Sequence, residues 1–178
     1  MTSDRKNMTK RFFLTLKYSC WRYLTASFLN WRFPFLRHAG DKWFTNTSWY
    51  YQIPEGWRKR FGYKMCRELY KELKRLDYVH QYKIMDIKEK YGSLRWSDNG
   101  VPENSKIFEI LLKYEGLSIN TCIVCGRKAE YISDGWICPY CKRHIKGKRI
   151  LETIDNSECN PCINSQNNVN QEKLIENE

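Results

Sequence analysis

The sequence contains no uninterrupted apolar run of about 18 residues, the length at which a segment becomes a candidate membrane-spanning helix. Met1 to Lys10 is polar and no cleavage-like site follows, so we expect no signal peptide. Disulfides are not expected either, although the chain has eight cysteines. A chain of 178 residues can form a core without such cross-links, and six of the cysteines stand in C-x-x-C pairs. These absences predict a protein of a reducing compartment, the cytoplasm.

The sequence also lacks the motifs of several enzyme classes. It has three histidines, His38, His80 and His144, and no Gly-rich phosphate loop, H-E-x-x-H motif or nucleophile elbow. An HNH nuclease needs a histidine base on its hairpin, and Tyr131 to Trp136 contain none. No H-x-E motif accompanies Cys138-Pro139-Tyr140-Cys141, which argues against a deaminase. We therefore predict a non-enzymatic protein without catalytic residues.

Acidic residues are absent from residues 5–40, which carry eight Lys or Arg side chains. The whole chain has a net charge of +11, and this surplus favours anionic partners. Aromatic rings are interleaved with the cations, and Phe13, Leu16, Cys20 and Leu24 recur at helical spacing. Four interpretations stay open: a helix that packs its aromatic face on the main body, a contact with nucleic acid, an amphipathic helix on an anionic membrane surface, and an organelle transit peptide.

Apolar periodicity predicts an α+β fold. Stripes at steps of three and four predict helices over 57–77 and 106–117, and alternation around Gly92 predicts a β-hairpin over 81–97. Changes in composition predict four segments: a basic aromatic N-terminal region (1–55), a helix–hairpin–helix unit (56–118), a zinc module (119–154) and a disordered Asn-rich tail (155–178).

Local details of the two helices are also predicted. On the first helix we expect ion pairs between Glu68 and Lys71 and between Glu72 and Arg75. The second helix is expected to start at Asn104 or Ser105, to end near Gly116, and to bury a stripe made of Ile107, Ile110, Leu111, Tyr114 and Leu117.

The most specific pattern lies between Cys122 and His144. Cys122 and Cys125 form one close pair, and Cys138, Cys141 and His144 follow at intervals of three. Two close pairs joined by about a dozen residues are typical of a four-coordinate zinc site. From the residues alone, either Cys138 with Cys141 or Cys141 with His144 can complete it. Because protein fills all four positions, the expected Zn²⁺ is structural.

The two choices of ligand predict different folds. Four cysteines would make a zinc ribbon, whereas a short helix over 142–150 would place Cys141 and His144 on its first turn, in a treble-clef zinc finger. A further pair, Cys159 and Cys162, lies in the Asn-rich tail, and we do not expect it to form a second site. The predicted module is therefore treble-clef-like or ribbon-like.

The segment from Trp57 to His144 contains a series of short motifs: Gly56-Trp57, the run from Ile87 to Trp96 (IKEKYGSLRW), the run from Tyr114 to Ser118, Thr121-Cys122-x-x-Cys125-Gly126, Gly135-Trp136 and Cys141-x-x-His144. In these motifs the chain resembles a family of uncharacterised small bacterial and phage proteins. The resemblance covers about half of the chain and implies a zinc-type module fused to a small α+β unit, with no known activity.

The resemblance also bears on the ligands. In that family the last pair is Cys-x-x-His or Cys-x-x-Cys, and the position of Cys138 is not a cysteine. It therefore favours Cys122, Cys125, Cys141 and His144 as ligands, with Cys138 as the alternative fourth ligand.

Exposed cations beside aromatic rings predict a contact with nucleic acid. Single-stranded or shape-read nucleic acid is favoured, because no groove-reading helix is evident. Tyr91 and Trp96 are the candidates for stacking on bases, although core packing suits Trp96 better. The predicted contact residues are Lys88, Lys90, Tyr91, Arg95, Arg127, Lys128, Lys142, Arg143 and Lys146. The alternative is an interaction module that inhibits or adapts a host protein through the aromatic N-terminal region.

Overall fold

The computed structural model describes residues 19–42 and 44–154. It opens with a helix over residues 19–32, followed by two 3₁₀ turns, η1 (Pro34–Leu36) and η2 (Trp49–Gln52). Ala26 and Leu29 of this helix are buried, and Leu29 joins the main core together with Phe33. The helix therefore packs on the body, but through its small and aliphatic side rather than its aromatic face.

The aromatic face of the same helix is exposed, as Trp21, Phe28 and Trp31 show. Leu24 and Cys20, predicted to share an apolar stripe, are exposed as well. The other two predicted members, Phe13 and Leu16, lie outside the described residues.

A long helical segment runs without a break from α2 (Glu55–Trp57) through the π-helical turn η3 (Arg58–Gly62) into α3 (Tyr63–Arg75). Its buried side chains follow in steps of four: Trp57, Phe61, Met65, Leu69 and Leu73. Each such step overshoots one helical turn by about 40°. The wider π turn offsets part of this drift and keeps the early members of the stripe on one face. The predicted helix over 57–77 is confirmed.

Strands β1 (Ile84–Lys90) and β2 (Ser93–Asp98) form the predicted antiparallel hairpin, with Ile87 opposite Trp96 and Lys90 opposite Ser93. Tyr91 and Gly92 connect them and have φ angles of 52° and 79°. Two successive positive φ angles define the type I′ turn that suits the twist of a two-residue hairpin. Ile87 and Leu94 are buried, so one face of the hairpin lies on the core.

Helix α4 (Ile107–Ile119) extends beyond Gly116, where the sequence predicted its end. The continuation turns Ser118 inward, and its Oγ accepts a hydrogen bond of 2.8 Å from the backbone N–H of Leu94. Leu117, predicted to be buried, is therefore exposed. At the other end, Ser105 Oγ accepts from the backbone N–H of Ile107 (3.0 Å), but the N-cap of the helix is Lys106, one residue after the predicted Ser105.

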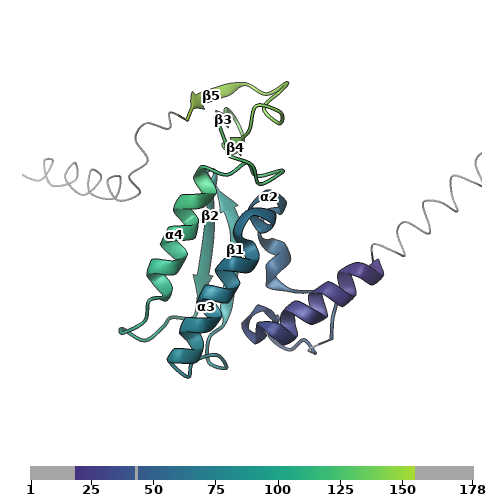
Figure 1. Cartoon of the computed structure of the whole chain (residues 1–178), viewed down its shortest axis with the longest axis vertical. Coiled ribbons are helices and arrows are strands. Elements are labelled where there is room, and N and C mark those ends of the chain that lie inside the picture. Colours follow the sequence, from purple (N-terminus) through teal and green to yellow (C-terminus); the bar gives the residue numbers. More distant parts are fainter. Residues whose placement is uncertain (1–18, 43, 155–178) are drawn as a thin grey trace, which may run out of the picture.

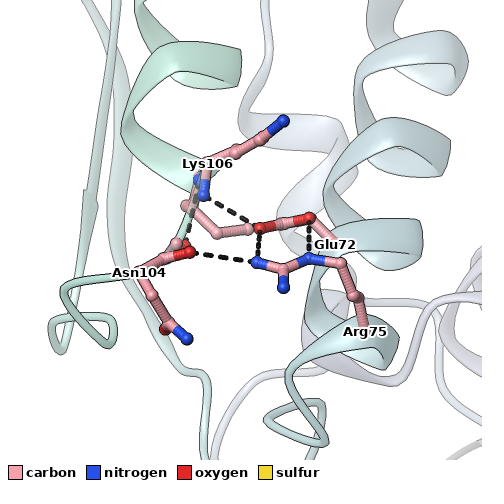
Figure 2. Close-up of polar contacts among 6 residues, drawn as sticks. Glu72, Arg75, Asn104 and Lys106 are labelled. Carbon is pink, nitrogen blue, oxygen red and sulfur yellow. Dashed lines mark hydrogen bonds and ion pairs between the residues drawn. The ribbon is translucent and has the colours of Figure 1, made fainter.

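The Glu72 carboxylate of α3 holds the start of α4. Glu72 accepts two hydrogen bonds from Arg75 (2.7 and 2.9 Å) and one from the backbone N–H of Lys106 (2.9 Å), while Arg75 also donates to the carbonyl of Asn104 (Figure 2). The predicted pair of Glu72 with Arg75 is thus present.

The other predicted ion pair is wrong. Glu68 pairs with Lys113 of α4 at 2.8 Å rather than with Lys71 on its own helix. The packing of the two helices brings the Lys113 ammonium to Glu68, which helical spacing alone does not show.

A second sheet lies beyond the common end of α2 and α4, at the top of Figure 1. It consists of β3 (Tyr131–Ser133), β4 (Pro139–Tyr140) and β5 (Ile150–Thr153), with β3 in the middle and both pairings antiparallel. Helices with small antiparallel sheets confirm the α+β prediction. Among the described residues, no helix combines the length and hydropathy of a membrane span.

Candidate metal centre

The first ligand pair lies on a tight turn that follows α4. The backbone N–H of Cys122 donates to Arg127 O (2.7 Å) and that of Gly126 donates to Cys122 O (2.9 Å). Gly126 has a φ of 77°, a conformation that glycine adopts without strain. The backbone N–H of Ile123 donates to Pro139 O (3.0 Å), so the turn is also tied to the start of β4.

The second pair lies on another turn, directly after β4. The backbone N–H groups of His144 and Ile145 both donate to Cys141 O, at 2.8 and 3.1 Å. The predicted helix over 142–150 does not form. Turns extend to Gly147, whose φ is 77°, and the chain then enters β5, which pairs with β3. A strand in this place fits the ribbon-like description of the module rather than the treble clef.

Together the two turns bring Cys122, Cys125, Cys141 and His144 into one group, with all four ligand atoms within 4.8 Å of one another. Cys125 Sγ lies 3.7 Å from Cys141 Sγ, and His144 Nδ1 lies 3.5 Å from Cys122 Sγ and 3.4 Å from Cys141 Sγ. Metal–ligand bonds of about 2.3 Å to sulfur and about 2.0–2.1 Å to nitrogen would place tetrahedral ligand atoms roughly 3.4–3.8 Å apart. The observed separations therefore suit a metal ion at the centre of the group.

The surroundings favour thiolate at one of these cysteines. Burial opposes ionisation of Cys125, but hydrogen bonds from the side chain (Nε, 3.5 Å) and backbone of Arg127 and from the Cys122 and Cys141 thiols together outweigh it, and the pKa of Cys125 falls to about 6. Burial raises the pKa of the Cys122 thiol. Metal binding requires deprotonated cysteines, so Cys125 is the ligand best prepared for it.

Cys138, the alternative fourth ligand, does not belong to the group of four. Its backbone N–H donates to Ser133 Oγ (3.3 Å) and its side chain is buried. Burial and the nearby Glu89 carboxylate raise the pKa of its thiol to about 12. A protonated thiol packed between the module and the hairpin explains the burial of Cys138 without any metal. The second candidate pair, Cys159 and Cys162, lies outside the described residues.

The first ligand turn is docked on the start of the long helical segment. Trp57 is fully buried and its Nε1–H donates to Thr121 O (2.8 Å), while the backbone N–H of Gly56 donates to Ile123 O (2.8 Å). A Cβ atom at Gly56 would lie 2.1 Å from Cys122 O, and one at Gly126 would lie 2.5 Å from Gly56 O. Two glycines therefore allow the two backbones to touch.

All nine predicted nucleic-acid contacts are exposed. Ion pairing divides the eight cations among them into two groups. On the hairpin, Lys88 pairs with Asp86 and Arg95 pairs with Glu115, so these two cations are partly neutralised. In the part of the chain that the structure describes, no carboxylate pairs with the remaining predicted cations: Lys90, Arg127, Lys128, Lys142, Arg143 and Lys146.

The two aromatic candidates differ. Tyr91 is 73% exposed at the hairpin tip. Trp96 packs against the core, and its Nε1–H donates to Tyr82 Oη (2.9 Å). Sequence reasoning missed Trp136, which is 75% exposed on the loop between β3 and β4. Its only sequence signal was its place in the Gly135-Trp136 motif.

Among the described residues, His38, His80 and Cys66 do not belong to this group. His38 stacks on Trp49 with the ring centroids 4.3 Å apart, and His80 is exposed. Cys66 is fully buried, and burial raises the pKa of its thiol.

Compared with known proteins, the chain matches no family model, no curated protein and no solved structure.

Proposed function

We propose that Cys122, Cys125, Cys141 and His144 hold one structural Zn²⁺ ion, and that the basic surface around this site binds nucleic acid. The observation that carries the first part is the grouping of three thiols and one imidazole within 4.8 Å of one another, with three of the separations at 3.4, 3.5 and 3.7 Å. Sulfur and nitrogen ligands in this geometry favour zinc over magnesium or calcium. Four protein ligands complete the coordination sphere, which is typical of a structural site.

The second part depends on the exposed cations around the site. Lys128, Lys142, Arg143 and Lys146 are exposed, and no described carboxylate pairs with them. Three thiolates and a divalent cation would leave the centre itself with a net charge of −1, and Arg127 beside Cys125 offsets this charge. Exposed cations of this kind attract a phosphate backbone and release its counterions.

Fluorescence anisotropy with labelled single-stranded and duplex oligonucleotides tests this proposal. Replacing Lys142, Arg143 and Lys146 together with alanine should weaken binding at least tenfold. The slope of log K against log salt should fall by about 0.7 for each lost contact with a single strand. The matched control replaces three exposed lysines elsewhere, Lys64, Lys71 and Lys83, and removes the same net charge. Equal weakening in both variants would contradict a specific surface.

A second candidate function is suggested by the exposed stripe on the helix over 19–32. Trp21, Leu24, Phe28 and Trp31 recur at steps of three and four, and each is exposed by more than half. Aromatic anchors of this kind dominate many protein interfaces. We propose this stripe as a contact for a host protein, which the basic protein would inhibit or adapt.

Salt and nuclease separate the two functions. A protein held by the stripe should be recovered from host lysate after nuclease treatment and at ~200 mM salt, and should be lost when Trp21 and Trp31 are both changed to serine. Binding of nucleic acid, in contrast, should weaken steeply between ~50 and ~200 mM salt. Binding of the stripe to anionic lipid vesicles instead would identify it as a membrane-surface contact.

The resemblance described above supports a protein of phage or mobile-element type that acts in the cytoplasm of a bacterial host. A gene that lies outside any phage or mobile element would count against this origin.

A further inference from the structure

A hollow of about 330 Å³ lies where the tip of the hairpin meets the loop between β3 and β4. Six residues from these two segments line it: Glu89, Lys90, Tyr91, Gly135, Trp136 and Ile137. Its volume is at the lower end of the range for small-ligand sites. The two walls come from the helix–hairpin–helix unit and from the predicted zinc module, so the site exists only when both are folded.

The hairpin wall is held in place by its turn. Tyr91 and Gly92 both have positive φ angles, and the backbone N–H of Gly92 donates to Glu89 Oε1 (2.7 Å). A Cβ atom at Gly92 would lie 3.4 Å from Ile137 O, so the tip of the hairpin touches the opposite loop directly. This contact sets the spacing between the two walls before any ligand arrives.

The opposite wall is held by side chains of its own loop. Ser133 Oγ donates to Trp136 O (2.5 Å), and Asp134 Oδ1 accepts from the backbone N–H of Gly135 (2.7 Å). Asp134 also pairs with Arg149. The backbone of Trp136 is therefore fixed, although its ring points into solvent.

The exposure of the two rings is what distinguishes this hollow. Trp136 and Tyr91 are 75% and 73% exposed, the highest values among the large apolar side chains of the described residues. Single exposed aromatics are ordinary, but here both line one hollow. Lys90 Nζ lies 5.5 Å from the centroid of the Tyr91 ring, which adds a positive charge at the same edge.

We propose that this hollow takes one unstacked base of a single-stranded nucleic acid, with Tyr91 and Trp136 providing the faces on which it stacks. This inference rests on the proposed nucleic-acid binding and names its substrate class. Aromatic faces next to a cationic surface suit a base and its phosphate. In a duplex both faces of each base are already covered, so a single strand is the fitting substrate.

The experiment compares three probes of equal length by fluorescence anisotropy: an intact single strand, a single strand of abasic sites, and a duplex. The full-length, zinc-loaded wild type should bind the intact strand at least fivefold more tightly than the abasic strand, because one stacked base accounts for about 1–3 kcal/mol. In Tyr91→Ala and Trp136→Ala this preference should disappear, while binding of the abasic strand should stay unchanged.

Two sets of variants serve as controls. Tyr91→Phe and Trp136→Phe keep a ring at each position and should retain the preference. Phe108→Ala removes a similarly exposed ring from α4, outside the hollow, and should behave as wild type. Since Tyr91 and Trp136 are largely exposed, their alanine variants should fold, which circular dichroism and zinc content will verify.

The outcomes separate the inference from the function on which it rests. If the wild type binds single strands but Tyr91→Ala and Trp136→Ala keep the preference for bases, the hollow is not the base site and the proposed function stands. If the wild type binds none of the probes, the proposed function itself fails. Equal or tighter binding of the duplex, or binding of a proline-rich peptide that Trp136→Ala abolishes, would overturn the inference.

Discussion

At the scale of single residues, glycine and cysteine positions decide how the metal-ligand turns attach to the rest of the molecule. Gly56 and Gly126 let two backbones approach to a distance that no side chain would allow. Cys138 sits beside the ligand group without belonging to it. Both features follow from contacts between segments that are far apart in the sequence.

Gly56→Ala should destabilise the protein by about 1–3 kcal/mol, because the added methyl group would overlap the carbonyl of Cys122. Gly116→Ala is the matched control. Gly116 lies inside α4 with open space around it, so alanine there should stabilise the helix by about 0.5–1 kcal/mol. Urea unfolding of both variants measures the difference, and equal stabilities would contradict the close contact at Gly56.

His144→Ala should lose zinc, because His144 Nδ1 lies 3.5 Å from Cys122 Sγ and 3.4 Å from Cys141 Sγ, as expected for ligands of one zinc ion. Cys138→Ser should retain it, because Cys138 lies outside the group. The ratio of zinc to protein after gel filtration checks both variants. Zinc lost only from Cys138→Ser would assign the fourth ligand to Cys138 instead.

At the scale of secondary-structure elements, the clamp between α3 and α4 is the best-defined polar contact (Figure 2). Glu72 is almost fully buried, yet it is ionised because Arg75 and the backbone N–H of Lys106 donate to it. Its hydrogen bond with Arg75, above all, lowers the pKa of Glu72 to about 2. The clamp therefore links the two helices only while the carboxylate stays charged.

The stabilisation from Glu72 should depend on pH in a defined direction. Its pKa is lower in the folded chain than the value of about 4.3 expected for an unfolded chain. The contribution is therefore complete above about pH 5 and is lost as the pH falls towards 2. Glu72→Gln should cost about 1–3 kcal/mol at pH 7 and much less near pH 2.

Glu68→Gln is the control for this measurement, because Glu68 is more exposed and its pair with Lys113 is open to solvent. Its cost should stay below about 1 kcal/mol at pH 7. Urea unfolding at pH 7, 5, 4 and 3 compares the two variants with the wild type. A cost of Glu72→Gln that does not change with pH would show that the carboxylate does not act through its charge.

At the scale of the whole molecule, the ligand turns and the helical body depend on each other. The backbone of the first turn is bonded to Gly56 and Trp57, and the hairpin tip contacts the loop that precedes β4. Loss of the metal should therefore destabilise parts of the protein well beyond the four proposed ligands. The same arrangement creates the hollow between Tyr91 and Trp136.

Removing the metal with a chelator should lower the melting temperature of the wild type by 10 °C or more, because the binding free energy of a structural zinc contributes to folding. His144→Ala provides the control, since a variant that holds no metal should melt at the same temperature with and without chelator. Differential scanning calorimetry measures both. An unchanged melting temperature in the wild type would contradict a structural metal.

The helices over 57–77 and 106–117, the hairpin and the set of candidate ligands were predictable from local patterns. Trp57, Phe61, Met65, Leu69 and Leu73 recur at helical steps, and a positive φ at Gly92 suits a two-residue turn. The errors arose where tertiary contacts override local preference. Helix α4 continues past Gly116, where Ser118 bonds the backbone of β2. The basic segment after His144 forms turns that lead into β5, which pairs with β3.

The sequence by itself determined the class of the fold and the pattern of candidate ligands, because periodicity and close Cys and His spacing are local properties. Only the tertiary structure decided which thiols meet. The turn after β4 places Cys141 and His144 beside Cys122 and Cys125, while Cys138 faces Glu89. The tertiary structure alone also brought Trp136 and Tyr91 to one hollow. A hollow between segments that are distant in sequence depends on how the hairpin docks, which the order of the residues does not show.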